Sequence, residues 1–193
     1  MNKEFLKIFK RIPTLTTERL QLRKIELRDI KHIYEYAKDP AVSEYLLWSP
    51  HPDIDFTREY VKYVRYLYRH ARFYDWAIMY KRKMIGTVGF TSFDLEKNSA
   101  EIGYVLNRNV WGKGIATEAV NKIVRFGFQV LGLNRIEARF MPGNLRSKAV
   151  LIKCKFSYEG LKRDAIEVEG RKIDVELFSM TRDEFEFSNC NIP

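Results

Sequence analysis

The stretch 100–120 contains the residues whose types and spacing suggest chemistry. A segment of alternating apolar residues runs into a turn with two glycines, Gly112 and Gly114, and then into a long amphipathic segment. Glycines let a backbone approach a ligand closely, and the first turn of a helix presents unpaired N–H groups at the positive end of the helix dipole. Lys113 adds a formal positive charge between the glycines. The segment therefore predicts a site for an anion such as a phosphate.

The glycine spacing excludes two common phosphate-binding patterns. A P-loop has four residues between its glycines, whereas Lys113 alone separates them here. The dinucleotide pattern GxGxxG also fails, because its last position is Thr117 and the preceding strands are expected to form hairpins. Glycines in a strand-to-helix turn are often only structural, so the nature of the ligand depends on the rest of the chain.

The elements around this segment follow from the hydrophobic periodicity. Alternation of apolar and polar residues predicts strands at 19–25, 73–80, 84–91, 99–106, 135–140, 156–161 and 172–181. Apolar residues at spacings of three and four predict helices at 29–38, 56–70, 114–131 and 144–153. We expect Asp55 to cap the second helix, Asn144 to cap the fourth, and Gly132 to end the third. This order predicts an α+β domain with a mixed, mostly antiparallel sheet.

Length and composition limit the class of protein. The chain of 193 residues is one domain long, and 46% hydrophobic residues exclude intrinsic disorder. We expect a domain at 14–184 with tails at 1–13 and 185–193. No apolar run reaches the roughly 18 residues that span a bilayer, and the N-terminal residues do not resemble a secretory signal. We therefore expect no membrane partner.

The cysteines and the net charge bear on the cellular location and on the binding partners. Cys154 and Cys190 lie far apart without metal-ligand spacing, so we expect no disulfide scaffold, no metal site and a cytoplasmic location. The chain has 34 Lys and Arg against 25 Asp and Glu, a net charge of +9. Such a charge suits ribosomal RNA, an acidic protein, a coenzyme phosphate or only a solvated surface. It does not choose among them.

Several motifs together resemble one family. The run VWGKGIATEA at 110–119 resembles the acyl-CoA pyrophosphate loop of the GNAT superfamily of N-acetyltransferases. Asn144 and Ser147, followed by Phe156, resemble the second cofactor motif of that superfamily, N-x-x-S with a later K-x-G-F. The opening TLTTERLQLRKIELRD and the runs GTVGFTSFD and SAEIGYVL resemble the branch with the Rim-type ribosomal-protein N-terminal acetyltransferases. The resemblance covers about 15–181.

The resemblance implies a central sheet, flanked by helices, that is splayed between its fourth and fifth strands with acetyl-CoA in the gap. The backbone of Val105 and Leu106 would pair with the pantetheine arm, Asn144 would hydrogen-bond that arm, and Ser147 would lie near the sulfur. Tyr45, Trp48 and Tyr104 would contact the acceptor. The pyrophosphate would be held by the backbone N–H groups of Trp111, Gly112, Lys113, Gly114, Ile115, Ala116 and Thr117.

The chain departs from the family pattern at three positions. Trp111 stands where the family usually has Gln or Arg, and Lys155 stands where a glycine usually precedes Phe156. Some members of the branch use a Glu beyond the next strand as a base. The corresponding position here is Ile166, with Glu167 beside it, so that mechanism does not transfer directly.

Acetyl transfer to an amine needs a base for the amine and a proton for the leaving thiolate. Glu101 is the candidate base, and it is expected to share a strand face with Gly103 and Val105. Its alternative role is a solvent-facing residue paired with a Lys. Ser147 is the candidate acid, on the first turn of a helix, and its alternative role is an ordinary helix-start hydroxyl.

These residues lead to one function with open alternatives. We expect an acetyl-CoA-dependent N-acetyltransferase that acts by direct attack in a ternary complex, most simply on a protein N-terminal α-amine. A small amine such as an aminoglycoside, a polyamine or an amino acid is the alternative acceptor. A non-catalytic acyl-CoA- or RNA-binding module on the same fold is the alternative class, and the chain is expected to be a monomer or a homodimer.

Overall fold

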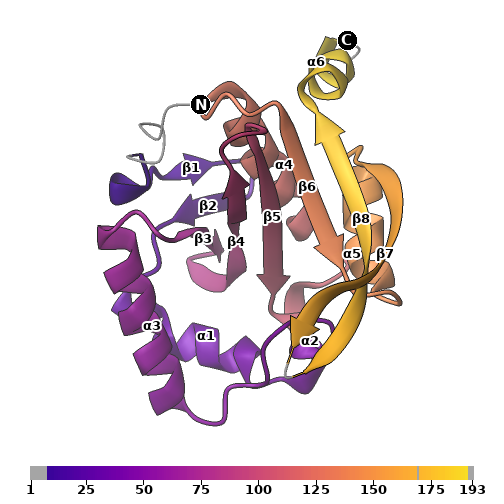
Figure 1. Cartoon of the computed structure of the whole chain (residues 1–193). Coiled ribbons are helices and arrows are strands. Elements are labelled where there is room, and N and C mark those ends of the chain that lie inside the picture. The colour runs from indigo at the N-terminus through magenta and orange to yellow at the C-terminus, as the bar shows by residue number, and fades with distance from the viewer. Residues whose placement is uncertain (1–7, 169, 191–193) are drawn as a thin grey trace.

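An eight-stranded sheet with helices on both faces forms the core of the computed structural model, which describes residues 8–168 and 170–190 (Figure 1). The strands are β1 (Leu15–Thr16), β2 (Leu20–Arg23), β3 (Tyr74–Tyr80), β4 (Lys83–Asp94), β5 (Ser99–Leu106), β6 (Arg135–Phe140), β7 (Ser157–Val168) and β8 (Arg171–Thr181). The helices are α1 (Ile30–Ala37), α2 (Pro40–Ser43), α3 (Ile54–Arg69), α4 (Ile115–Gln129), α5 (Leu145–Lys153) and α6 (Arg182–Cys190).

The strand order is β1-β2-β3-β4-β5-β6-β8-β7, and the prediction of a mixed, mostly antiparallel sheet is confirmed. The pairing of β5 with β6 is parallel, whereas the other neighbouring strands pair antiparallel. The predicted hairpin of β3 and β4 also forms. Its turn residues Lys81 and Arg82 both have positive φ, 48° and 65°, which is the conformation of a tight two-residue turn that follows the twist of the strands.

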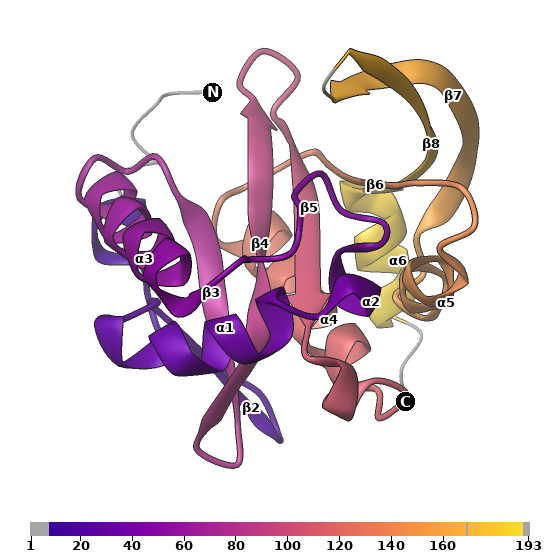
Figure 2. The ribbon, with the colours of Figure 1, turned by 90° about the horizontal axis from the view of Figure 1, so that it is seen from below.

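Helices lie on both faces of the sheet (Figure 2), and an apolar layer packs beneath the helices on each face. One lies between the sheet and the helices α1 and α3, and includes Ile33, Val61 and Ala77. The other lies between the sheet and α4 and α5, and includes Val120 and Leu151. Alternation along β5 assigns Ile102, Tyr104 and Leu106 to the α4/α5 face, so Glu101, Gly103 and Val105 belong to the α1/α3 face.

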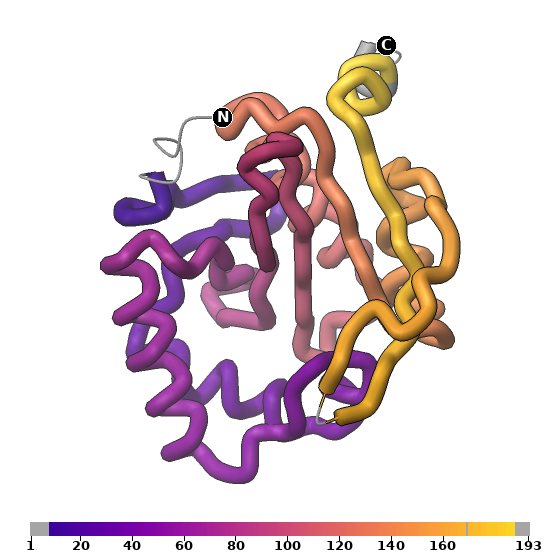
Figure 3. The backbone as a smooth tube through the Cα atoms, viewed as in Figure 1, coloured from indigo at the N-terminus to yellow at the C-terminus, as the bar shows by residue number. Residues whose placement is uncertain are grey.

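The sheet splits between β5 and β6. Their pairing is limited to Ser99 with Arg135, Ala100 with Ile136, and Glu101 with Glu137. Beyond these residues the two strands separate (Figure 3). These are the two strands for which the splay was predicted, labelled β5 and β6 because the short β1 precedes them. The gap opens beside the C-terminal part of β5, directly before the glycine turn.

The structure corrects several local predictions. Asp53, and not Asp55, caps α3, because its carboxylate accepts the Phe56 N–H at 2.7 Å, while Asp55 pairs with Arg58 inside the first turn. The short helix α2 was not predicted. The strand expected at 156–161 extends to Val168, because backbone pairing with β8 continues through a largely exposed segment whose side chains carry no periodic signal.

The ends of the chain add to the domain. Phe9, in the segment expected as a tail, is fully buried against Tyr74 and Trp76, and α6 begins before the expected end of the domain at 184. Residues 1–7 and 191–193 of the expected tails lie outside the described part of the chain. The boundaries at 14 and 184 stay predictions.

Candidate active site

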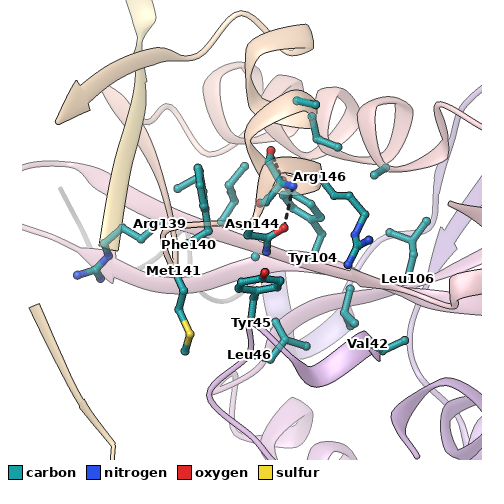
Figure 4. Close-up of a pocket in the computed structure, with 18 of the residues that line it drawn as sticks. Val42, Tyr45, Leu46, Tyr104, Leu106, Arg139, Phe140, Met141, Asn144 and Arg146 are labelled. Atoms are coloured by element: carbon teal, nitrogen blue, oxygen red, sulfur yellow. Dashed lines mark hydrogen bonds between the residues drawn. The ribbon is translucent and has the colours of Figure 1, made fainter. Parts of the chain in front are cut away.

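A cavity of about 500 Å³ lies in the split of the sheet, within the size range of small-molecule sites. Its walls come from α2 and the loop after it, β5, the glycine turn, the first turn of α4, the end of β6, α5, and the β7–β8 hairpin. Figure 4 shows side chains from these separate segments converging on one space, with Tyr45 and Asn144 facing each other near its centre. The cavity therefore reaches both faces of the sheet.

The glycine turn forms one wall. Gly112 and Gly114 have φ of 74° and 72°, a left-handed conformation that favours glycine, and Gly114 is the N-cap of α4. The Lys113 ammonium donates to the Asn109 carbonyl at 2.9 Å, and Lys113 does not line the cavity. Arg19 supports the turn from outside by donating to the Lys113 carbonyl at 3.0 Å. The turn thus offers an anion backbone N–H groups and a helix N-terminus.

The edge of β5 beside this turn is open toward the gap. Val105 and Leu106 pair with β4 on one side and have no β6 partner on the other. The indole N–H of Trp111 donates to the Leu106 carbonyl at 2.9 Å. A ligand that pairs with this edge would therefore compete with Trp111 for that carbonyl. Lys155, a second departure from the family pattern, takes φ of 67°, so the expected local turn forms without glycine.

Glu101 forms an ion pair with Arg139 where the two strands part. The Glu101 carboxylate oxygen Oε2 accepts from the Arg139 guanidinium, and both residues line the cavity from the α1/α3 face. The hydrogen bond that Arg139 donates to Glu101 raises the pKa of Arg139. The alternative prediction for Glu101, a solvent-facing side chain paired with a Lys, is not observed. The carboxylate is 18% exposed and pairs with an arginine inside the cavity.

Ser147 and Tyr104 meet on the opposite side of the gap. The two hydroxyl oxygens lie 2.7 Å apart, and the Tyr104 hydroxyl also lies 3.2 Å from the Ser147 carbonyl. Asn144 is the N-cap of α5, as predicted, and its side-chain oxygen accepts the Ser147 N–H at 3.0 Å. Burial raises the pKa of Tyr104 far above its usual range, so this hydroxyl stays protonated at neutral pH and can donate.

Arg146 connects three walls of the cavity. Its guanidinium lies over the Trp111 ring, 4.2 Å from the ring centroid, and 3.8 Å from the Glu44 carboxylate after α2. Figure 4 shows its side chain reaching across the space between Tyr104 and Leu106. The sequence did not indicate Arg146 or Arg139. Arg139 carried one signal, its place on the polar face of the alternating segment 135–140.

The remaining predicted residues lie as follows. Tyr45 and Trp48 line the cavity from the loop after α2, and Ile115, Ala116 and Thr117 line it from the first turn of α4. Ile166 reaches it from β7, whereas its neighbour Glu167 does not.

Cys154 lies next to this site without lining it. Burial raises the pKa of its thiol to about 12, so the thiol is protonated at neutral pH. In the described part of the chain, no three metal-ligating side chains gather and no helix is long and apolar enough to cross a membrane.

Comparison with known proteins identifies the family to which this chain is similar. Residues 19–157 match the family model described as an acetyltransferase (GNAT) domain. The N-acetyltransferase p20 of Bacillus licheniformis is 42% identical over 89% of this chain and 98% of its own. The ribosomal protein uS5 alanine N-acetyltransferase of Escherichia coli is 28% identical over 52% of this chain and 53% of its own.

A solved structure gives the same result for the fold. The crystal structure of an acetyltransferase of the GNAT family from Bacillus anthracis superimposes with a TM-score of 0.78 at 25% identity, over 89% of this chain and all of that one. The split sheet, the glycine turn before α4 and the family match thus agree. The chain belongs to the acetyltransferase (GNAT) domain family, and it is an N-acetyltransferase that uses acetyl-CoA.

Proposed function

We propose that this enzyme transfers the acetyl group of acetyl-CoA to the α-amine of a protein N-terminus, by direct attack in a ternary complex. The observation that carries the proposal is the placement of two proton-transfer groups on opposite sides of the split: Glu101 on the α1/α3 face and Ser147 on the α5 side. An amine and a thioester can then meet between them. The similarity to an enzyme named for an alanine of a ribosomal protein supports this acceptor class.

Acetyl-CoA would lie along the wall that the glycine turn begins. The backbone N–H groups of 111–117 would hold its pyrophosphate, because the left-handed glycines and the start of α4 direct donors to one place. The open edge at Val105 and Leu106 would pair with the pantetheine amides. The Asn144 side-chain oxygen already caps α5, which leaves the Asn144 side-chain NH₂ group as the donor to that arm.

The chemistry follows from these positions. The amine nitrogen forms a bond to the acetyl carbon, the carbon–sulfur bond breaks, and the amine proton passes to Glu101 directly or through a water. The departing thiolate takes a proton from the Ser147 hydroxyl, which the protonated Tyr104 hydroxyl holds in place. Ser147 then regains a proton from water, and Glu101 gives up to water the proton that it took from the amine, so the products are an amide and free CoA and both residues are restored. Near the site, the Cys154 thiol is buried and protonated, which favours direct attack over an acetyl-cysteine intermediate.

The experiment uses peptides with a free or a blocked N-terminus, each with one internal lysine. We expect acetyl transfer to the free α-amine, located by fragment masses, and none to the blocked peptide. Incubation with acetyl-CoA alone should leave the intact mass of the protein unchanged. Acetylation of the lysine alone would contradict the acceptor class, and an acetylated protein that passes its acetyl group to an added amine would contradict direct attack.

The cellular location of the enzyme is part of the proposal. We propose that the enzyme works in the cytoplasm, which the two widely spaced cysteines favour. A net charge of +9 suits a protein that works beside ribosomal RNA. Sedimentation of the protein with ribosomes at low and at high salt tests this: retention at low salt that is lost at high salt is expected, and no retention at low salt would contradict it.

A further inference from the structure

The acceptor half of the cavity lies on the face of the sheet that carries Glu101 and Arg139. Two segments far apart in the sequence enclose it: the loop after α2 on one side, and the end of β6 with the β7–β8 hairpin on the other. Figure 4 shows Leu46 and Met141 directed toward this space from different elements. The side chains that these segments contribute to the lining are mostly apolar, and include Leu46, Leu47, Trp48, Met141, Ile166 and Val175.

The charges in the lining limit the acceptor to one ammonium group. Among the described residues that line the cavity, Glu101 is the one carboxylate, and its partner Arg139 already compensates it. Arg146 and Lys153 add two further cations. A polyamine or an aminoglycoside would bring several ammonium groups into a lining that has no second carboxylate to receive them. Burial of such unpaired charges is costly, so the lining selects against polycations.

The Glu101–Arg139 pair matches the polar part of a peptide N-terminus. The carboxylate can receive the amine, and the guanidinium, whose side chain is 37% exposed, can donate to the carbonyl of the first residue. A simple alkyl amine lacks this carbonyl. The pair therefore offers one partner for the amine and one for the adjacent carbonyl group.

The apolar walls fit the side chain that accompanies such an amine. Leu47 and Trp48 are 52% and 36% exposed, so the loop after α2 presents apolar surface that is not covered by this chain. Ile166 faces the same cavity from β7. A large apolar side chain on the first residue would cover these surfaces, whereas a methyl or hydroxymethyl group would leave them largely in water.

We propose that the acceptor is a peptide N-terminus whose first residue is large and apolar, such as Leu, Ile, Phe or Met. Its amine lies at Glu101, its first carbonyl at Arg139, and its side chain between the loop after α2 and the hairpin. This inference rests on the proposed function and narrows it to one class of N-terminus.

The first test is a set of pentapeptides that differ in their first residue. We expect kcat/KM for Leu, Phe and Met to exceed that for Ala and Ser by at least about 10-fold, the scale on which an apolar pocket separates side chains. Equal or faster acetylation of Ala or Ser would overturn this inference and leave the proposed function intact. Faster acetylation of spermidine or kanamycin than of every peptide would overturn both.

The second test asks which lining residues give the preference for a large apolar first residue. Trp48→Ala and Met141→Ala should each reduce the preference for Leu over Ala by about 3-fold or more, while acetyl-CoA affinity stays unchanged. Tyr63→Ala is the matched control, since Tyr63 is a 59% exposed aromatic on α3 that does not line the cavity. An unchanged Leu-to-Ala preference in both cavity variants would overturn the proposed position of the side chain.

The third test addresses Arg139 with two acceptors, the Leu peptide and isoamylamine, which has the same side chain without the carbonyl. The wild-type protein should favour the peptide through a lower KM, and Arg139→Gln should remove most of that difference. Binding of CoA by the variant shows that it is folded. An undiminished KM ratio in a folded variant would overturn the role of Arg139 as a specificity-determining residue.

Discussion

The two halves of the cavity are built differently. The half proposed for acetyl-CoA presents backbone groups of one short stretch, 105–117, and the start of α5. The acceptor half takes side chains from the loop after α2, from β5, from β6 and from the β7–β8 hairpin. Backbone donors depend on local conformation, which a few glycines set. Converging side chains depend on the register of the sheet. The halves should therefore respond differently to substitution.

The largest effect is expected at the glycine turn. Gly114→Asp places a side chain and a negative charge on a residue with φ of 72° at the start of α4, and should weaken CoA binding by at least about 100-fold in calorimetry. Gly132→Asp is the control, because Gly132 also has positive φ, 70°, but does not line the cavity. Equal losses in both variants would mean that strain, and not the anion site, is responsible.

A large effect on turnover without an effect on CoA binding is expected in the acceptor half. Glu101→Gln should lower kcat by about 10- to 1000-fold, because a general base is lost. Glu137→Gln is the control, since Glu137 is the parallel partner of Glu101 on β6 but does not line the cavity. An unaltered kcat in Glu101→Gln would leave the carboxylate with a structural role.

A smaller effect is expected at the proton donor. Ser147→Ala should reduce kcat by about 3- to 30-fold with CoA binding nearly intact, since water can replace the hydroxyl. Tyr104→Phe should reduce kcat less, because it removes only the group that orients Ser147. Ser157→Ala on β7 serves as control for a hydroxyl that does not line the cavity. A larger loss in Tyr104→Phe than in Ser147→Ala would reverse the two roles.

The smallest effect is expected at Arg146, which joins the two halves. Loss of its guanidinium removes a cation from the cavity and the stack on Trp111, so Arg146→Ala should weaken CoA binding by about 3- to 10-fold, and less at high salt. Lys148→Ala removes a charge from the same helix at a residue that pairs with Glu176 and does not line the cavity. A similar loss in Lys148→Ala would indicate a general effect of charge.

The same difference between the halves explains which structural features the sequence could predict. The glycine turn before α4 is set by a few neighbouring residues, and so is the pair of Asn144 and Ser147 at the start of α5, so propensity and spacing are sufficient for each. The segment 162–168 was missed because strand pairing with β8 is a backbone interaction that its exposed side chains do not reveal. Asp55 was expected as the cap because the apolar spacing predicted a helix from Phe56, whereas α3 begins at Ile54, directly after Asp53.

The sequence by itself determined the class of fold and the glycine turn before α4, because periodicity, glycines and helix caps act over short distances along the chain. The split between the two strands was expected only from the resemblance to the GNAT superfamily. Tertiary structure decided which side chains meet in the gap. Glu101 meets Arg139, and Arg146 meets Trp111 and Glu44, only because the divergence of β5 and β6 and the position of α2 bring distant segments together. Such contacts depend on three-dimensional packing, which no local pattern of residues encodes.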